Sequence, residues 1–235
     1  DKKLIVPEVN INQLTLNDKI IANPNCSTIQ LVAVLYPLHV KYKIKRVVVS
    51  TYQSVTGSGI LGVNQLMDER KNIKVDKNAY PHKIDLNCIP QGGDFLDNFY
   101  TEEEWKLVME SRKIMSIPNL ALTATVVRVP VLGGHSESVN IEFENKPNLF
   151  ELENILKKSK GIIVKDNINQ NIYPMPIDCK DKNEIFVGRI RTDNSCENAV
   201  NLWICADNLR KGAATNAVQI AQYVYNKFVK NGKEV

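Results

Sequence analysis

Strand-like and helix-like segments alternate along the 235 residues of this chain, and the alternation limits the folds that it can adopt. Runs rich in β-branched residues predict strands at 4–6, 40–52, 120–132, 136–144, 162–164, 185–191 and 202–205. Helical spacing and capping residues predict helices at 27–35, 60–71, 101–115, 148–160 and 212–230. Long connections join these elements, which favours an α+β or α/β domain over an all-β sandwich.

Particular residues indicate where the predicted helices begin and end. Asn25 is a favourable N-cap residue, and Pro37 is expected to stop the helix that Asn25 opens. Thr101 and Glu104 have the spacing of a capping box, so a helix is expected to begin there. The last helix has one apolar face, which is expected to pack on sequence that precedes residue 1. This face consists of Ala214, Ala217, Ala221, Val224 and Phe228.

The composition argues against several classes of protein. With 43% apolar and 24% charged residues, the chain is typical of a soluble globular protein. No uncharged apolar run approaches the roughly 18 residues of a membrane span, and no signal-peptide pattern opens the chain. The net charge of +4 arises from basic residues scattered among acidic ones, which argues against nucleic-acid binding. The first residue, Asp1, suggests that further sequence precedes it.

The five cysteines are odd in number and show no CxxC spacing, so neither a disulfide framework nor a metal site is expected. Such a set indicates a reducing compartment, and we expect a cytoplasmic protein. Cys26 stands at the first turn of a predicted helix, where backbone N–H groups and the positive helix end favour a reactive thiolate. The alternative is a small buried apolar residue, although the polar neighbours Asn25 and Ser27 argue against an apolar pocket.

His135 follows Gly133 and Gly134 at a bend between two predicted strands. Imidazole exchanges protons near neutral pH, and the glycines let a substrate approach the backbone, so His135 is a candidate acid/base. The alternative is a turn histidine with a satisfied hydrogen bond. His39 and His82 have no comparable setting, and we expect structural roles for them.

Three further charged residues allow both a structural and a functional interpretation. Arg128 interrupts an apolar strand, so its guanidinium is either an edge-strand charge in water or a clamp for a carboxylate. Glu103 and Lys106 lie one turn apart on a predicted helix, which is the spacing of a weak surface pair.

Two strand-to-helix corners have the composition of anion-binding turns. Gln53 precedes the turn at 56–59, and Lys211 with Gly212 forms a similar corner after Asn208. Free N–H groups at such corners suit an anion, yet corners of this kind are common. No GxGxxG fingerprint occurs, so the chain carries no dinucleotide-binding loop of the usual kind.

Together and in this order, these segments resemble the aspartate-semialdehyde dehydrogenase family along nearly the whole chain. The residues that carry the resemblance are Val6–Asn10, Asn25–Thr28, Ser50–Gly57, Arg128–Val131, Gly134–Ser138, Tyr173–Pro176, Val187–Arg191 and Asp207–Ala214. The combination of these motifs is highly specific. It implies the reversible, phosphate-dependent oxidation of L-aspartate 4-semialdehyde to L-4-aspartyl phosphate, in lysine, methionine and threonine biosynthesis.

The resemblance also implies roles for the candidate residues. Cys26 resembles the nucleophile that forms a thioester, and His135 resembles its acid/base partner. Gln53 resembles the residue that orients the thiohemiacetal. Arg128 and Glu103 resemble the pair that holds the α-carboxylate and α-amino group of the substrate.

Further contacts to substrate and cofactor are implied in the same way. Asn25 and Lys106 resemble substrate-binding residues, with Lys106 directed toward phosphate. The cofactor of the family is NADP, and the residues that resemble its contacts are Thr56, Gly57, Asn208, Lys211 and Gly212. The family usually has serine at the position of Thr56, and this change keeps the hydroxyl.

The implied fold is α+β: a mixed, mostly antiparallel sheet with helices on one face, like the C-terminal domain of glyceraldehyde-3-phosphate dehydrogenase. Residues 1–10 would end a nucleotide-binding domain, 11–206 would form the catalytic and dimerisation domain, and the helix in 207–235 would return to the nucleotide-binding domain. Family members begin with a Rossmann-type domain that carries the main NADP loop, and this sequence lacks it. We therefore expect the 235 residues alone to be inactive with NADP.

The implied partners are a small-molecule substrate, phosphate and a second copy of the chain, as a homodimer or a homotetramer. The predicted strand 40–52 is expected in the interface. Neither nucleic acid nor a membrane is an expected partner. Three alternatives remain open: an N-acetyl-glutamyl-phosphate reductase, a cysteine hydrolase that uses Cys26 and His135, and a non-catalytic dimerisation module.

Overall fold

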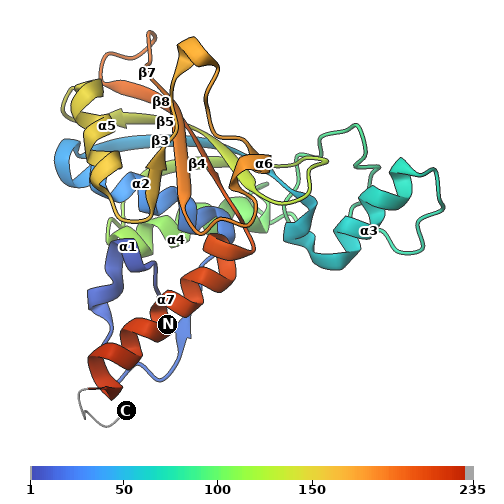
Figure 1. Ribbon diagram of the computed structural model, residues 1–235, viewed down its shortest axis with the longest axis horizontal. Helices are drawn as coiled ribbons and strands as arrows, with labels where there is room; N and C mark the ends of the chain where they lie inside the picture. The colour runs from blue at the N-terminus through green and yellow to red at the C-terminus, as the bar shows by residue number, and fades with distance from the viewer. Residues whose placement is uncertain (1, 231–235) are drawn as a thin grey trace.

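The computed structural model of the protein describes residues 2–230, and its centre is a six-stranded sheet (Figure 1). The strands lie in the order β4-β3-β5-β8-β7-β6. The outer pairs β3–β4 and β6–β7 are parallel and the inner pairs are antiparallel, which confirms the expected mixed, mostly antiparallel sheet. The strands are β3 (Ile44–Gln53), β4 (Ala121–Arg128), β5 (His135–Phe143), β6 (Ile162–Val164), β7 (Ile185–Thr192) and β8 (Ala199–Ala206).

Helices cover one face of this sheet, as expected (Figure 1). The helices α2 (Cys26–Tyr42), α4 (Glu102–Met115) and α5 (Leu149–Lys158) share one apolar core with alternate residues of the strands. On β3, for example, Val47 and Val49 are buried in this core, whereas Tyr52 is exposed on the other face. Burial of a large aliphatic side chain contributes about 1.5–3 kcal/mol. The core therefore fixes which side of each strand faces the helices.

The prediction that Pro37 ends the first long helix was wrong. Helix α2 continues through Pro37 to Tyr42, and β3 consequently begins at Ile44 rather than at Val40. An internal proline removes a helical hydrogen bond and costs about 3 kcal/mol. Burial of the helix beyond the proline offsets this cost: Tyr42 is buried, packs edge-on against Phe143 with ring centroids 5.6 Å apart, and donates a hydrogen bond from its hydroxyl to α5.

The capping predictions at the other helices are confirmed. At α4, Thr101 accepts a hydrogen bond from the N–H of Glu104, and the Glu104 carboxylate accepts one from the N–H of Thr101. The side chain of Asn148 caps α5 in the same way as Asn25 caps α2. The strand predicted for 120–132 ends earlier, at Arg128, two residues before a proline.

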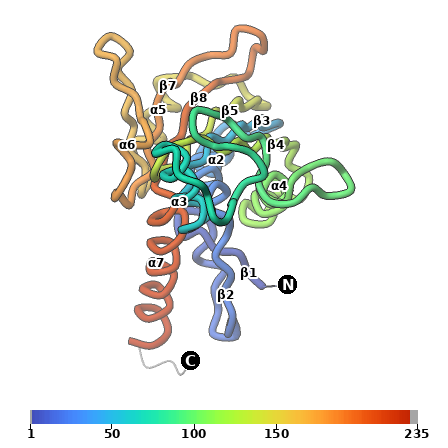
Figure 2. The backbone as a smooth tube through the Cα atoms, turned by 90° about the vertical axis from the view of Figure 1, so that its right-hand side faces the viewer, coloured from blue at the N-terminus to red at the C-terminus, as the bar shows by residue number. Residues whose placement is uncertain are grey.

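The chain between β3 and α4 forms an arm that projects from the sheet (Figures 1 and 2). The arm contains a short helical turn η2 (Val55–Ser58) and α3 (Gly59–Arg70), which confirms the predicted turn and helix. Its own small core consists of Val55, Leu66, Tyr80, Ile84 and Ile89. Where the arm returns, the backbones of Ile89 and Arg128 exchange two hydrogen bonds, of 3.0 and 2.8 Å. This exchange anchors the arm at the end of β4.

The N-terminal segment and the C-terminal helix lie side by side below the sheet (Figures 1 and 2). The first contains β1 (Lys3–Leu4), α1 (Pro7–Asn10), η1 (Ile11–Gln13) and β2 (Ile21–Ala22). The second is α7 (Thr215–Val224), flanked by the π-helical turns η4 (Arg210–Ala214) and η5 (Tyr225–Val229).

Part of the apolar face of the C-terminal helix packs within this chain. Ile220 and Phe228 share a buried cluster with Ile5 and Leu14. The expectation that this face also packs on sequence before residue 1 stays a prediction. Three further residues of the face, Ala217, Ala221 and Val224, line a groove of about 280 Å³ together with Ile21. The expected regions 1–10 and 207–235 include residues 1 and 231–235, which lie outside the described residues, and the domain boundaries stay a prediction.

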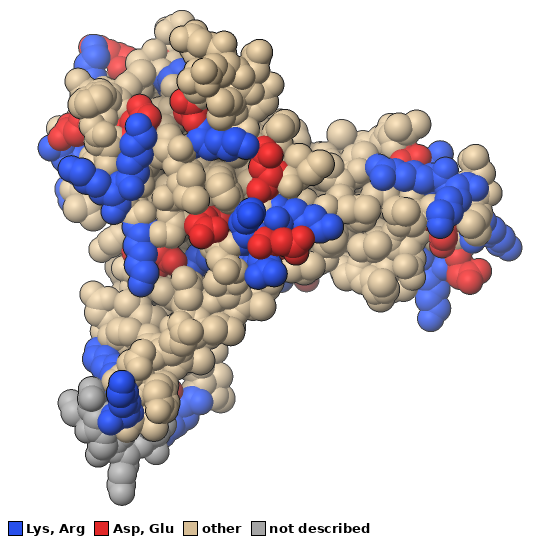
Figure 3. Space-filling view, viewed as in Figure 1, with Lys and Arg blue, Asp and Glu red and all other residues tan. Residues whose placement is uncertain are grey.

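Two smaller elements, η3 (Ile168–Gln170) and α6 (Pro176–Cys179), lie between β6 and β7. None of the helices within residues 2–230 has the length and apolarity needed to cross a bilayer. Basic and acidic side chains are interspersed over the face drawn in Figure 3, as the scattered charges of the sequence predict.

Candidate active site

Three of the predicted site residues form a row across the sheet. Gln53, the last residue of β3, pairs with Arg128 at the end of β4 on one side. On the other side it pairs with His135 at the start of β5. All three are buried, and strand alternation places them on the face that the helices cover. The mixed sheet therefore brings an amide, a guanidinium and an imidazole together from positions far apart in the sequence.

Cys26 reaches this row because it is the first residue of α2. The Asn25 side chain caps the helix by accepting hydrogen bonds from the N–H groups of Ser27 (3.0 Å) and Thr28 (3.4 Å). The Gln53 amide then donates a hydrogen bond of 2.6 Å to the Ser27 hydroxyl, which ties the start of the helix to the end of β3. The other end of the Gln53 amide, Oε1, is buried without a partner in the described part of the chain.

Two glycines let the backbone approach these side chains closely. A Cβ at Gly212 would lie 2.8 Å from the Cβ of Cys26. A Cβ at Gly57 would lie 2.9 Å from Nη1 of Arg128 and 3.1 Å from Nε2 of His135. The contact at Gly212 is closer than a real Cβ tolerates, and a Cβ at Gly57 would displace the end of the Arg128 side chain. Since Arg128 and His135 meet the same point at Gly57, their side chains face one site.

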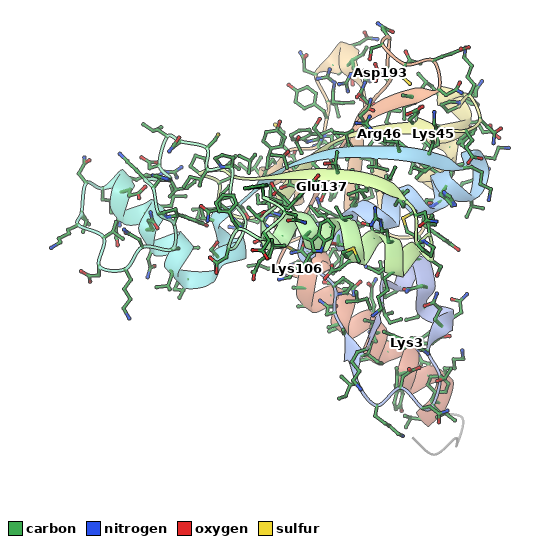
Figure 4. The ribbon with its side chains drawn as sticks, turned by 180° about the vertical axis from the view of Figure 1, so that it is seen from behind. Lys3, Lys45, Arg46, Lys106, Glu137 and Asp193 are labelled. Atoms are coloured by element: carbon green, nitrogen blue, oxygen red, sulfur yellow. The ribbon has the colours of Figure 1, made fainter. Side chains whose placement is uncertain are left out.

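Arg128 is a buried member of an ion pair, and the interpretation as an edge-strand charge in water was wrong. Its Nη2 lies 2.7 Å from Oε1 of Glu103 on α4, while its Nε is buried without a partner among residues 2–230. Glu103 pairs with Arg128, and no ion pair with Lys106 within 4.0 Å occurs in this range; the expected surface pair was therefore also wrong. Lys106 is exposed on α4 (Figure 4).

A cavity of about 520 Å³ opens beside Arg128 and Glu103. Its size suits a small substrate. Gly57 forms part of its wall, and the arm supplies most of the remainder through Ser58, Ala79, Tyr80, Pro81, Ile89, Gln91, Gly93 and Asp94. The ring of Tyr80 lies 6.0 Å from the Arg128 guanidinium, and its hydroxyl donates a hydrogen bond to Ser58.

The buried imidazole of His135 has different surroundings at its two nitrogens. Nδ1 accepts a hydrogen bond of 3.1 Å from the backbone N–H of Ser54 and lies 3.2 Å from the Ser54 hydroxyl. Nε2 is buried without a partner in the described chain. Burial, together with the smaller effect of the positive charge of Arg128, lowers the pKa of His135 to about 3. The imidazole is therefore neutral at physiological pH.

The expectation that the helix N-terminus favours a Cys26 thiolate was wrong for this state of the site. Burial and, to a smaller extent, the Glu103 carboxylate raise the pKa of the Cys26 thiol to about 12. Arg128 and the backbone N–H of Ser27 act in the opposite direction but are outweighed. Cys26 itself is half-buried, so a reagent can reach it.

Asn208 joins the two segments that hold His135. Its Oδ1 accepts hydrogen bonds from the hydroxyls of Ser54 (3.1 Å) and Thr56 (3.1 Å) and from the N–H of Gly134 (3.2 Å). Thr56 and Asn208, predicted as cofactor contacts, thus lie next to the imidazole.

The side chain of Lys211 is engaged elsewhere. Its ammonium lies 2.7 Å from the Glu8 carboxylate of α1 and donates hydrogen bonds to Asn216 and Gln219. The ammonium is buried, and only the backbone of Lys211 is left for the predicted cofactor contact.

Sequence reasoning gave no role to three residues of this site. Ser27 and Ser54 directly follow Cys26 and Gln53, and Tyr80 comes from the arm. The adjacency of the two serines to proposed catalytic residues was an available signal, whereas Tyr80 had none. Within residues 2–230 no group of three or more His, Cys, Asp and Glu side chains is placed to hold a metal ion.

Comparison with known proteins supports one family. Residues 35–211 match the family model described as semialdehyde dehydrogenase, dimerisation domain. The aspartate-semialdehyde dehydrogenase of Aquifex aeolicus is 47% identical over 229 residues, covering 94% of this chain and 67% of that protein. The Bacillus subtilis protein of the same name is 46% identical, covering 93% of this chain and 67% of its own length.

Solved structures agree with the sequence relatives. The crystal structure of aspartate semialdehyde dehydrogenase II from Vibrio cholerae, described as complexed with ASA, has a TM-score of 0.91 to this chain and 39% identity. The match covers 96% of this chain and 68% of that one. The chain thus spans about two thirds of the length of these relatives.

Proposed function

This chain belongs to the aspartate-semialdehyde dehydrogenase family, and we propose that it forms the catalytic and dimerisation part of an enzyme that interconverts L-4-aspartyl phosphate and L-aspartate 4-semialdehyde. The observation that carries the proposal is the convergence of Cys26, Gln53, Arg128 and His135 at one end of the sheet, next to a substrate-sized cavity. A cysteine suits this reaction because sulfur is both a good nucleophile and a good leaving group in a thioester.

Arg128 and Glu103 offer the charges that an α-amino acid needs. The buried Nε of Arg128 has no partner in the described chain, and a guanidinium binds a carboxylate through paired N–H groups. The Glu103 carboxylate, at the wall of the cavity, would accept hydrogen bonds from the ammonium group of the substrate. Asn25 keeps its amide N–H groups for the substrate because its Oδ1 caps α2. We assign Lys106, one turn after Glu103 and exposed, to the phosphate.

In the direction of aldehyde formation, the Cys26 sulfur attacks the acyl carbon of L-4-aspartyl phosphate. The carbon–sulfur bond forms, the bond between the acyl carbon and the bridging phosphate oxygen breaks, and phosphate leaves. The product is a thioester on Cys26. Gln53, fixed through its Nε2 to Ser27, has a free Oε1 that would orient the hydroxyl of the later thiohemiacetal. Collapse of the thiohemiacetal releases the aldehyde and returns Cys26.

A nicotinamide cofactor, for which we propose NADP, supplies the hydride that reduces the thioester. The residues present fit such a group, because the exposed Gly57 leaves bare backbone beside His135 where a flat ring can lie. For Lys211 we propose a contact through the backbone alone, since its side chain is held by other residues. The residues that would border the ring are Thr56, Gly57, Asn208 and Gly212.

We further propose that two copies of the chain pair through the uncovered face of the sheet. Tyr52 of β3 and Trp203 of β8 lie together on this face with ring centroids 5.3 Å apart. Exposed aromatic residues are enriched in protein interfaces. Analytical ultracentrifugation is expected to show a homodimer, or a homotetramer built from it. A monomer at micromolar concentration would contradict this part of the proposal.

Mass spectrometry of the complete enzyme tests the reaction. Incubation with L-4-aspartyl phosphate, in the absence of a cofactor, should leave an acyl group on Cys26. The Cys26→Ala variant should carry no acyl group and turn over no substrate while its circular dichroism stays unchanged. Cys88→Ala is the matched control, because Cys88 is exposed, and it should behave like the original enzyme.

Other outcomes would favour the alternatives. Residual turnover by Cys26→Ala would remove Cys26 from the mechanism. Acylation by N-acetyl-glutamyl phosphate in place of aspartyl phosphate would indicate the related reductase. Hydrolysis of an ester without a nicotinamide would indicate a cysteine hydrolase, and absence of any Cys26 reactivity would indicate a dimerisation module.

A further inference from the structure

Glu137 is a buried acid to which the proposed reaction gives no role. It lies two residues after His135 on β5, so both side chains project from the sheet face that the helices cover (Figure 4). Glu137 is fully buried, and neither oxygen of its carboxyl group has a hydrogen-bond partner in the described chain. A charged carboxylate is costly in such a place, and each buried polar group of this kind requires an explanation.

The Gln30 side chain connects Glu137 with the residues of the site. Gln30 lies one turn after Cys26 on α2 and is 1% exposed. Its Nε2 donates a hydrogen bond of 3.4 Å to the backbone carbonyl of His135, while its Oε1 is buried without a partner within residues 2–230. The same amide is close enough to Glu137 to act on the pKa of its carboxyl group. Gln30 therefore lies between the acid and the backbone of His135.

Thr51 supplies a second polar group beside Glu137. The two residues are paired directly across β3 and β5, which places their Cβ atoms about 4.5–5.5 Å apart on the same face. Thr51 is fully buried, and its hydroxyl also has no partner among the described residues. A hydroxyl can rotate to donate a hydrogen bond to a carboxyl oxygen. Thr51 is therefore a suitable donor to one oxygen of Glu137.

The protonated form of Glu137 satisfies all three side chains together. A protonated carboxyl group has one O–H donor and keeps an oxygen that accepts. The O–H can donate to Oε1 of Gln30, and the other oxygen can accept from the hydroxyl of Thr51. The Nε2 of Gln30 then stays on the carbonyl of His135. Each atom that lacked a partner in these side chains thus gains one.

Ionisation of Glu137 would disturb this chain of hydrogen bonds. A carboxylate only accepts, so it would compete with the carbonyl of His135 for the Nε2 of Gln30. The Oε1 of Gln30 would then lose the only donor that Glu137 can give it. The protonation state of Glu137 therefore decides which way the Gln30 amide is held.

The groups around Glu137 do not favour its ionisation. Burial raises the pKa of Glu137 well above its ordinary value, and the Cys205 thiol of β8 acts in the same direction. The Gln30 amide of α2 acts in the opposite direction but is outweighed. Arg128 of β4 is already paired with Glu103 of α4. The thiol and the imidazole of the site are both uncharged at neutral pH, so neither supplies a compensating charge.

We propose that Glu137 is a positioning residue that remains a neutral carboxylic acid and holds the Gln30 amide on the backbone carbonyl of His135. The inference rests on the proposed function, with Cys26 as the nucleophile and His135 in the acid/base role that the family resemblance implies. Gln30 belongs to the helix that begins at Cys26, and Glu137 to the strand that begins at His135. The chain of hydrogen bonds thus ties together the two elements that carry the reacting groups.

Infrared spectroscopy of the complete enzyme tests the protonation state. A neutral carboxylic acid has a carbonyl band apart from those of carboxylates, and the difference between the original enzyme and Glu137→Gln isolates the band of Glu137. We expect this band at neutral pH, with a shift in heavy water. Its absence would mean an ionised Glu137 and overturn the proposal. Glu142→Gln is the matched control on the same strand and should keep the band, because Glu142 is partly exposed and paired with Lys45.

Two substitutions test the positioning role by kinetics. Glu137→Gln keeps an N–H donor for Gln30 and an acceptor for Thr51, whereas Glu137→Met has neither. We expect Glu137→Met to lower kcat by about 100-fold, as for a misplacement of about 1 Å, and to leave KM nearly unchanged. Substrate binding is assigned to Arg128 and Glu103, which the substitution does not touch. Glu137→Gln should recover most of the loss in kcat. Equal losses in both variants, or an unchanged kcat in Glu137→Met, would contradict the proposal.

The Gln30→Met variant keeps the test decisive if Glu137→Met does not fold. This substitution removes the acceptor of the Glu137 proton, so the infrared band of Glu137 should move. The kcat should fall by about the same factor as expected for Glu137→Met, because both variants break one chain of hydrogen bonds. A band that does not move would show that Glu137 is not bonded to Gln30 and would overturn the proposal.

Failure of this proposal can be separated from failure of the proposed function. Acylation of Cys26 by aspartyl phosphate, read by mass spectrometry, reports the function alone. The infrared band of Glu137, measured without substrate, reports the present proposal alone. Acylated Cys26 together with an ionised Glu137 would overturn the positioning role and leave the thioester route intact.

Discussion

The Gln53 amide donates a hydrogen bond of 2.6 Å to the hydroxyl of Ser27, and this bond connects the end of β3 with the start of α2. Ser27 directly follows Cys26, and Gln53 lies between Arg128 and His135 in the sheet. The contact therefore ties the residue that follows Cys26 to the row of polar groups on the strands.

Replacement of Ser27 should reveal the contribution of this contact. In Ser27→Ala the buried Nε2 of Gln53 loses its acceptor, and an unsatisfied buried donor costs about 1–3 kcal/mol. We expect the free energy of unfolding in urea to fall by this amount and kcat to fall as well. In a Gln53→Met background, Ser27→Ala should lower the free energy of unfolding far less, because the Gln53 amide donor is absent. Equal costs in both backgrounds would show that the two side chains are not coupled.

The reactivity of Cys26 should respond to the charge on Glu103. The Glu103 carboxylate raises the pKa of the Cys26 thiol, so its removal in Glu103→Gln should lower that pKa. Alkylation by iodoacetamide, followed for the Cys26 peptide by mass spectrometry, should consequently begin at lower pH in the variant. The exposed Cys88, alkylated in the same sample, is the internal control and should keep its profile. An unchanged profile for Cys26 would contradict the electrostatic coupling.

Local sequence signals predicted much of the fold because they act within a few residues. The capping box of Thr101 and Glu104 and the N-cap of Asn25 are such signals, and the structure contains both. Pro37 predicted the end of α2. The helix continues because burial of Tyr42 against the sheet outweighed the hydrogen bond that the proline removes. A local rule fails where packing with distant residues contributes more.

The site illustrates the same limit at longer range. The N–H of Ser54 lies against His135, 81 positions further along the chain, because β3 and β5 are neighbours in the sheet. Motif spacing placed His135 in the site but could not show which of its nitrogens is free. The Lys211 motif similarly suggested a cofactor contact, whereas its ammonium is buried against Glu8 from the other end of the chain.

The Lys211–Glu8 pair should be important for stability. The side chains are 1% and 6% exposed, and removal of one member of a buried pair leaves an uncompensated charge. Lys211→Met is expected to lower the free energy of unfolding by about 3–5 kcal/mol. The double variant Glu8→Gln with Lys211→Met should recover part of this loss, since no buried charge remains. Urea denaturation measures both, and a loss below about 1 kcal/mol in the single variant would contradict a buried pair.

Acid should destabilise the enzyme through His135. Its pKa falls from an ordinary 6.5 to about 3 in the folded protein, mainly through burial. Between these two values the unfolded chain binds a proton that the folded protein does not. His135 therefore does not lower the free energy of unfolding above about pH 6.5. As the pH falls from there toward 3, the free energy of unfolding decreases.

The comparison with His135→Gln isolates this contribution, because glutamine does not titrate. Urea denaturation at intervals between about pH 6.5 and 4 should show the original enzyme losing stability more steeply than the variant, by about 1.4 kcal/mol for each pH unit. Every ionisable group other than residue 135 is the same in both proteins, so the contributions of these groups cancel in the difference. Parallel stability curves would mean that His135 accepts a proton in the folded state, which the N–H of Ser54 at 3.1 Å opposes.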